Sequence, residues 1–563
     1  MQLLVPHLGF NPGPGNAVVA VGVVPTTHSG PEPAGSAYLT GPGIEPLPLG
    51  PGPAEQMPGW SIRSCTRIPL PADLAPGTYV VRIGATESAP FVVEPDRLQR
   101  QTMSDVLAYF KAMRSSGEID RKDRGARRWD DVSGTTVDAR GGWLDASGDT
   151  SKFLSHLTYT STMSPQQIPL CAWAMLAARD EITAHHPALT RLLGARLRDE
   201  ALHGADFLVR FRSPDGYFYT GIFDALTKQL DERVVTAPLQ NSVRTSRYQA
   251  AYRHGAGLAI AALARAATTD TDGDHSRAEY LTAALDAFTH LEQHNRDYLF
   301  DNTESIVDDY CALLGATELA AALRAAADER VAEVANSAWR RASSLVSRYV
   351  SPADGPGWFR ADEGGRPFVH AVEPGLPILA LLRFAEVFPT SRQAKYAQET
   401  AIRAMLDVLR RTAAVANPFG YPRNALGQFF FPHENETGYW WQGENAAIAS
   451  LSAAASACAR LDEVGWADRV RLSTFATDQL AWILGRNPYD VCMLQGRGRN
   501  NVEYHSDFPN LPGGIVNGIT SGWTDEREIA FLPADAPGGE EWRWAEQWIP
   551  HTGWFLLAAA SAD

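Results

Sequence analysis

Three acidic side chains have types and positions suited to bond cleavage. Residues 141–149 read GGWLDASGD, which places Asp145 and Asp149 four residues apart in a turn rich in Gly and Ser. A third acid, Glu546, lies between tryptophans in the C-terminal stretch 544–548 (WAEQW). Hydrolysis of a glycosidic bond needs one carboxylate to activate water and one carboxylic acid to protonate the leaving oxygen. The alternative is that the acidic loop is only a turn.

The environment of each acid indicates its chemistry. The Gly-rich turn would let the loop approach a ligand closely. Glu546 among Trp544, Trp548 and Trp554 should be desolvated, so its pKa should rise and keep it protonated, as a general acid must be.

A second cluster joins acids with rings that could stack on a sugar. Residues 433–441 read HENETGYWW, and Trp143 lies directly beside the acidic loop. We predict that the following residues bind substrate: Trp143, His433, Glu436, Tyr439, Trp440 and Trp441. A buried aromatic turn is the alternative for the cluster. His433, Glu434 and Glu436 could instead hold a metal ion, but we expect no metal and no cofactor.

Composition limits the classes of partner. The chain has 563 residues, 45% of them hydrophobic and 20% charged, so it should form a folded protein of more than one domain. Its net charge of −15 argues against nucleic acid, because phosphate binding needs basic patches. No apolar run is long enough to span a membrane.

Two further features bear on the compartment. The sequence starts without the basic and apolar regions of a secretory signal, which predicts a cytoplasmic location. The five cysteines are odd in number and widely spread, which predicts buried free thiols. The oligomeric state stays open.

Two kinds of structure should position these residues. Residues 1–97 alternate short apolar runs with Pro and Gly, as in a small all-β sandwich. Residues 98–563 are dominated by helical spacing of apolar residues, beginning with Met103, Val106, Leu107 and Phe110.

The helical region contains about twelve helices. After the first, which begins near Leu98, they are expected near 166–183, 189–212, 246–268, 275–297, 303–324, 328–349, 371–388, 391–414, 442–461, 464–485 and 541–561. Several are apolar on more than one side and should pack on two faces. Six helical hairpins closed into an (α/α)6 toroid fit this count. Long irregular stretches at 116–165, 213–245, 415–441 and 486–540 should carry function.

Several motifs in order resemble one family. The loop 141–149 is similar to the GGW-x-DAGD loop of glycoside hydrolase family 9, the inverting cellulase family. Residues 484–488 (LGRNP) are similar to another element of that family, and 511–518 (LPGGIVNG) to its PGALVGG segment. The stretch from Glu546 to Phe555 resembles its closing helix. Residues 69–93 resemble the end of the immunoglobulin-like domain found in one branch.

The resemblance implies roles and a substrate. It makes Asp149 the general base, Asp145 the acid that helps hold the water, and Glu546 the general acid. His505 is a partial counterpart of a substrate-binding His-His-Arg. The family loop usually has its acids three residues apart. Here Ser147 is inserted and the acids are four residues apart, a spacing similar to that of the exo-glucosaminidase branch.

The expected activity is therefore inverting hydrolysis of β-1,4 linkages in cello- or chitosan-oligosaccharides, acting from a chain end. The alternatives are an endo-acting cellulase, a lyase or epimerase on the same fold, and a non-catalytic sugar-binding protein. A lyase would need basic residues for uronates, and a binding protein would lack one of the acids.

Overall fold

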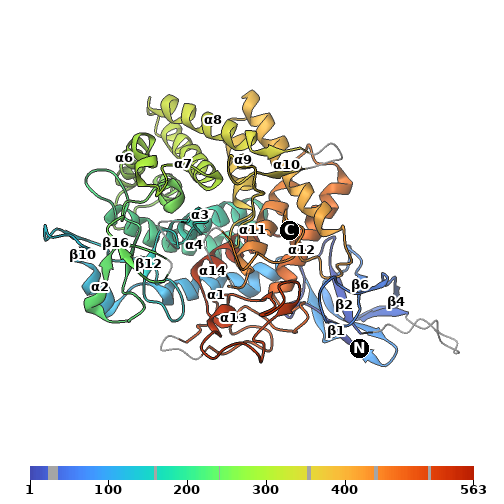
Figure 1. Cartoon of the computed structure of the whole chain (residues 1–563). Coiled ribbons are helices and arrows are strands. Elements are labelled where there is room, and N and C mark those ends of the chain that lie inside the picture. The colour runs from blue at the N-terminus through green and yellow to red at the C-terminus, as the bar shows by residue number, and fades with distance from the viewer. Residues whose placement is uncertain are drawn as a thin grey trace.

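A computed structural model of the chain describes residues 1–22, 36–156, 161–239, 241–351, 357–435, 440, 442–504 and 509–563. Figure 1 shows a small β-domain in blue beside a larger helical domain. The β-domain ends with a strand at Phe91–Val93, and the first helix begins at Arg97.

Two antiparallel sheets form the β-domain. The first has the order β1-β2-β6-β5, with β1 Gln2–Leu4, β2 Ala17–Val21, β6 Cys65–Pro69 and β5 Ala54–Glu55. The second has the order β4-β3-β7-β8, with β4 Ile44–Leu49, β3 Ala37–Gly41, β7 Gly77–Ile83 and β8 Thr86–Glu87, while β9 Phe91–Val93 also pairs with β7. Alternate residues of β7 are buried against a core shared by the two sheets, as in a sandwich.

Six inner helices form a closed ring, which confirms the (α/α)6 toroid. They are α3 Ile168–His185, α5 Ala256–Ala267, α7 Ile306–Ala325, α9 Leu376–Val387, α11 Asn445–Ala459 and α14 Ile549–Ala560. Each contacts the next in this order, and α14 contacts α3 to close the ring. Nearly every residue of α5, α11 and α14 is buried, because these helices pack on both sides.

An outer layer surrounds the ring. Its helices are α1 Arg97–Met113, α4 Pro187–Arg210, α6 Arg277–His294, α8 Val331–Ser347, α10 Arg392–Thr412 and α12 Trp466–Ile483. All twelve predicted helices are present, although the predicted bounds were often longer. The short helices α2 Gly117–Asp123 and α13 Trp542–Ala545 lie in connections. Gly257 lets α5 approach α7, since a Cβ there would lie 2.6 Å from the Cys311 backbone.

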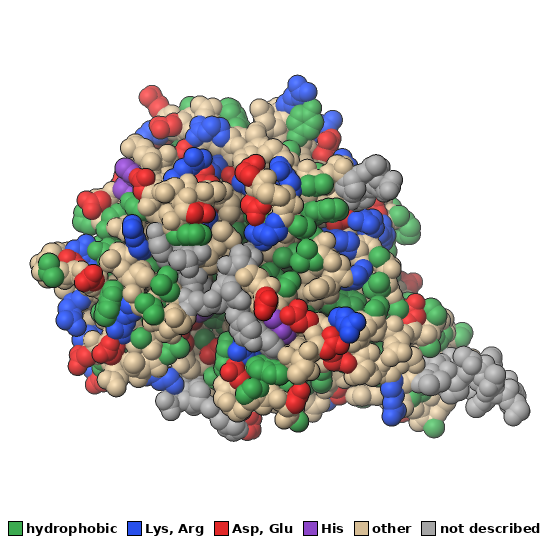
Figure 2. All heavy atoms as spheres, in the orientation of Figure 1, with side chains coloured by type: hydrophobic (Ala, Val, Ile, Leu, Met, Phe, Trp, Pro, Cys, Tyr) green, Lys and Arg blue, Asp and Glu red, His purple; other side chains and the backbone are tan. Residues whose placement is uncertain are grey.

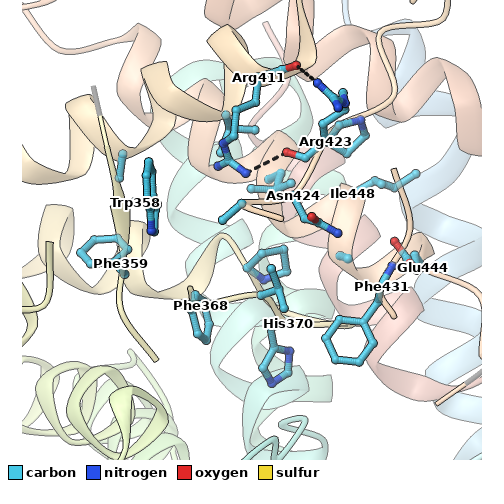
Figure 3. A pocket seen from close by; sticks show the side chains of 18 of the residues that line it. Trp358, Phe359, Phe368, His370, Arg411, Arg423, Asn424, Phe431, Glu444 and Ile448 are labelled. Carbon is cyan, nitrogen blue, oxygen red and sulfur yellow. Dashed lines mark hydrogen bonds between the residues drawn. The ribbon is translucent and has the colours of Figure 1, made fainter. Parts of the chain in front are cut away.

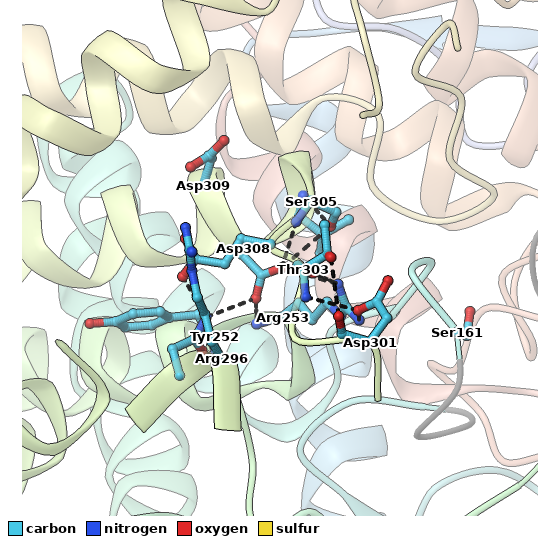
Figure 4. Close-up of polar contacts among 12 residues, drawn as sticks. Ser161, Tyr252, Arg253, Arg296, Asp301, Thr303, Ser305, Asp308 and Asp309 are labelled. Carbon is cyan, nitrogen blue, oxygen red and sulfur yellow. Dashed lines mark hydrogen bonds and ion pairs between the residues drawn. The ribbon is translucent and has the colours of Figure 1, made fainter. Parts of the chain in front are cut away.

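A buried ion pair and a helix cap join the chain where α5 and α7 begin (Figure 4). Arg253 lies in the 3-10 turn before α5 and is fully buried, with Nη1 3.2 Å from Oδ2 of Asp308 in α7. Ser305 caps α7 with its side chain, and Asp308 accepts from the Ser305 N–H at 2.9 Å. These contacts satisfy orphan N–H groups at the helix start.

A five-stranded sheet lies in stretches that we predicted to be irregular. Its order is β11-β10-β14-β13-β12, with β10 Ala126–Arg128, β11 Thr136–Val137, β12 Lys152–Phe153, β13 Gly221–Phe223 and β14 Val234–Val235. Two- and three-residue strands are too short to show alternation, so the prediction missed them. β12 begins three residues after Asp149 and pairs with β13, which fixes one end of the acidic loop.

The remaining elements are short. Two-residue strand pairs form between β15 Ala237–Pro238 and β16 Arg244–Thr245, β17 Tyr349–Val350 and β18 Trp358–Phe359, and β19 Thr520–Ser521 and β20 Ile529–Ala530. The 3-10 turns are Leu230–Glu232, Tyr252–His254 and Asn295–Tyr298.

The sandwich shares a core with the toroid. Trp60 is buried, with its ring centroid 5.1 Å from that of Phe429 and 6.1 Å from that of Trp482. Arg486, in the LGRNP element, is fully buried, pairs with Asp478 and donates to a β2 carbonyl at 3.0 Å. The β-domain therefore packs on the helical domain, and the LGRNP element helps to join them.

Among the described residues, none of the helices combines the length and apolar character needed to cross a membrane. The five cysteines are free and buried, as predicted.

Candidate active site

The two aspartates lie on a tight hairpin. The Asp145 N–H donates to the Ser151 carbonyl at 2.9 Å, and Ala146 and Asp149 exchange backbone bonds of 3.3 and 3.2 Å. Ser147 and Gly148 form the tip, where Gly148 has a φ of 117° that favours glycine. The Gly-Ser composition thus produces a two-residue turn, with Asp149 at one end and Asp145 one residue before the other.

The chain before α14 pairs with this hairpin and brings in the third acid. Ala146 pairs with Trp548 in antiparallel fashion, and the Ser147 N–H donates to the Gln547 carbonyl at 2.8 Å. On its other side the Glu546 carbonyl accepts from the Asn517 N–H at 2.7 Å. Segments about 400 residues apart in sequence therefore meet, because α14 lies next to α3 in the closed ring.

Asp145 is the most enclosed of the three acids. Its Oδ1 accepts from Trp548 Nε1 at 3.0 Å and from the fully buried Gln167, which precedes α3. Its Oδ2 lies 3.7 Å from His156 Nδ1. Burial, followed by the nearby charge of Asp149, raises the Asp145 pKa well above its usual range.

Asp149 is half-buried and better placed to ionise. Burial raises its pKa, while hydrogen bonds from Ser151 oppose that rise. One of these bonds is the Ser151 N–H to Asp149 Oδ1, at 2.8 Å. The Asp224 charge also raises the pKa, and the Arg233 charge lowers it. The two aspartates titrate as a coupled pair, and these interactions favour Asp149 as the first of the pair to lose its proton.

A buried network of charged side chains holds the backbone of the acidic loop. Asp123 lies 2.7 Å from Lys152 Nζ and accepts a bidentate pair from Arg233 at 2.8 Å. Arg233 also donates to the Thr150 carbonyl at 2.8 Å, and Lys152 to the Gly141 carbonyl at 3.0 Å. Because both cations bond to the backbone on either side of the acids, this network holds the hairpin in place.

Glu546 is half-buried and lies just after α13, in extended backbone. Burial, followed by the charges of Asp145 and Asp149, raises its pKa well above the usual range. The predicted direction is therefore confirmed, but the neighbouring aspartates contribute to it. The resemblance placed this acid on the closing helix. That placement is wrong, since α14 begins at Ile549.

The predicted substrate-binding residues have different outcomes. Trp143 is fully buried, and its Nε1 donates to Glu200 at 2.9 Å. Its ring has no exposed face, so its predicted sugar contact is wrong. Trp143 instead anchors the start of the acidic loop in the core. His433 and Trp440 are also mostly buried, with the Trp440 ring 6.1 Å from that of Trp548.

Four predicted substrate-binding residues lie outside the described residues: Glu436, Tyr439, Trp441 and His505. Among the described residues, no group of three or more His, Cys, Asp or Glu side chains is arranged to hold a metal ion.

A mostly apolar pocket lies between α9, α10 and α11 (Figure 3). The three acids are not among its described lining residues. Glu444 lines it and accepts from the Phe431 N–H at 2.5 Å and the Tyr421 hydroxyl at 3.3 Å. Burial raises the Glu444 pKa to about 8, which favours the neutral form of this acid.

Sequence reasoning missed several residues that hold the acids. They are Gln167, Asn510, Asn517, Lys152 and Arg233. Their types are common and their partners are distant in sequence, so no local signal could have found them.

A closed (α/α)6 toroid with three clustered carboxyl groups is the arrangement of a glycoside hydrolase. The sequence model of glycosyl hydrolase family 9 matches residues 100–512, more than half of the chain. The chain therefore belongs to glycosyl hydrolase family 9. The matched region includes Asp145 and Asp149 and ends before Glu546. No curated protein matches the sequence.

Solved structures share the fold over most or all of the chain. A metagenome-derived family 9 endoglucanase is 19% identical, with a TM-score of 0.66 over 100% of this chain and 99% of that one. An endoglucanase of the termite Nasutitermes takasagoensis is 16% identical, with a TM-score of 0.52 over 82% of this chain and 98% of that one. At this identity the likeness concerns the fold.

Proposed function

We propose that the protein hydrolyses β-1,4 linkages between gluco-configured sugars with inversion at the anomeric carbon. In this proposal Glu546 is the general acid, Asp149 the general base, and Asp145 helps to hold the water. The observation that carries it is the pairing of the acidic hairpin with the chain around Glu546.

The protonation states follow from the surroundings of each acid. Glu546 has a raised pKa and therefore starts with its proton, which it gives to the leaving oxygen as the glycosidic bond breaks. Water attacks the opposite face of the sugar, and Asp149 takes its proton as the new bond forms. An inverting pair stands roughly 6.5–9.5 Å apart to leave room for that water. The carboxyl proton thus moves from Glu546 to the leaving sugar, and one water proton moves to Asp149.

The preferred substrate in this proposal is a short oligosaccharide cut from its end, with glucosamine-containing chains ahead of cello-oligosaccharides. The Asp145–Asp149 spacing, which is similar to that of the exo-glucosaminidase branch, supports this choice. A desolvated carboxylate–ammonium bond contributes about 1.5–3 kcal/mol, which would favour an amino sugar beside one ionised carboxylate of the site. Endo-acting cellulase is the second candidate, because the two similar structures are named endoglucanases.

The location proposed for this activity is the cytoplasm. Five free, buried thiols support a reducing compartment. Nucleic acid is not a proposed partner. Among the described residues on the face shown in Figure 2, Lys and Arg are interspersed with Asp and Glu rather than gathered into one basic surface.

A substrate panel tests this proposal. Cello- and chitosan-oligosaccharides of two to six sugars, with and without N-acetyl groups, are incubated with the enzyme and their products separated by chromatography. We expect single sugars to appear first, with kcat/KM about 10- to 100-fold higher for the free amine than for the glucose chain. Rapid viscosity loss on a soluble glucan would instead show internal cutting. The Glu546→Gln variant controls for contaminating hydrolases.

A further inference from the structure

Ser147, the residue added to the acidic loop, makes three hydrogen bonds at the hairpin tip. It is 2% exposed. Its N–H donates to the Gln547 carbonyl at 2.8 Å, and its hydroxyl accepts from the Gln547 N–H at 2.8 Å. The same hydroxyl donates to Asn510 Oδ1 at 2.7 Å. The Ser147 hydroxyl is therefore both a hydrogen-bond donor and an acceptor.

Hydrogen bonds hold the backbone on both sides of Glu546. Gln547, which follows it, is held by Ser147. Ala545, which precedes it, has a carbonyl that accepts from Asn510 Nδ2 at 2.7 Å. Gln547 is itself fully buried, and its side-chain amide exchanges bonds of 2.8 and 2.7 Å with the Leu511 backbone. The backbone on each side of Glu546 is thus tied to the acidic loop through Ser147 and Asn510.

We infer that Ser147, acting with Asn510, is a positioning residue that sets where the Glu546 carboxyl stands relative to Asp149. This inference rests on the roles proposed above for those two acids. A three-residue loop without Ser147 would offer no hydroxyl to the Gln547 N–H. In this chain the extra residue therefore does more than lengthen the turn.

The expected consequence concerns proton donation. A displacement of about 1 Å at a catalytic group can cost about 10²-fold in rate. Substrates with poor leaving groups need the acid in place, while an aryl glycoside with a good leaving group needs it less. Loss of the Ser147 hydroxyl should therefore reduce turnover of natural oligosaccharides more than turnover of aryl glycosides.

The test compares Ser147→Ala, Asn510→Ala and the double variant on both substrate types. Ser155→Ala is the matched control, since the Ser155 hydroxyl is buried and makes no hydrogen bond within the described part of the chain. We expect Ser147→Ala to lower kcat on the oligosaccharide about 10- to 100-fold, with KM within about twofold and the aryl substrate at least partly spared. The double variant should lose about as much as Ser147→Ala alone, because Asn510 is tied to the acidic loop through the Ser147 hydroxyl.

Equal losses on the two substrate types would mean general damage and overturn the inference, as would full activity of Ser147→Ala or an equal loss in Ser155→Ala. Asn510→Ala keeps the test open if Ser147→Ala does not fold, and melting temperatures identify that case. Failure of the proposed roles has a separate sign, which is normal turnover by Glu546→Gln.

Discussion

Replacing Glu546 with Gln should lower kcat on natural oligosaccharides by about 10²–10⁴-fold. Gln has nearly the same shape but cannot supply a proton to the leaving oxygen. An aryl glycoside with a good leaving group should be partly spared. Steady-state kinetics on the two substrate types measure the difference.

The pH dependence gives the same test a second readout. Glu546 is the acid only while protonated, and its pKa is raised by burial and by the charges of Asp145 and Asp149. Activity on oligosaccharides should therefore fall as the pH rises through that raised pKa, and this limb should be missing from Glu546→Gln on the aryl substrate. Glu541→Gln, the same change at an exposed acid of the same segment, should behave like the unaltered enzyme. Normal oligosaccharide turnover by Glu546→Gln would remove Glu546 from the mechanism.

Asp149→Asn should lower kcat on oligosaccharides and aryl glycosides alike, by about 10²–10⁴-fold. Every substrate needs the water to be activated, so a good leaving group brings no relief. Asp145→Asn should also lose activity, but less. Added azide should restore turnover of the aryl glycoside only to Asp149→Asn, because azide attacks without giving up a proton. The product would be a glycosyl azide of inverted configuration.

Asp130→Asn is the matched control for this pair, since Asp130 is exposed and outside the acidic hairpin. Its kinetics should not change. If azide restored turnover to Asp145→Asn instead, Asp145 would be the general base and Asp149 the acid that helps to hold the water. Near-normal activity in both aspartate variants would mean that the hairpin is a structural turn.

The helices could be predicted from sequence because their apolar composition and spacing indicate that they are buried. Helix α11, for example, consists almost entirely of small and apolar residues and is buried throughout. The sheet that carries β12 could not be predicted, since its strands are two or three residues long and their pairing depends on partners up to about a hundred residues away.

The candidate site was only partly predictable. The three acids were found from residue type and motif order, and the structure brings them together. Trp143 was misassigned because an aromatic ring beside an acid can serve a sugar or a core, and only its burial distinguishes the two. Gln167 and Asn510 hold the acids through contacts with residues 22 and 35 positions away in sequence, which no local pattern indicates.

The central claim is that water attacks the face of the sugar opposite the bond that breaks. Proton NMR of the first sugar released from a β-linked oligosaccharide, recorded before mutarotation equilibrates the product, measures this directly. Attack promoted by Asp149 while Glu546 protonates the leaving oxygen predicts that the α-anomer appears first. Initial release of the β-anomer would show retention, with a covalent intermediate, and would contradict the assignment of Asp149 as a base.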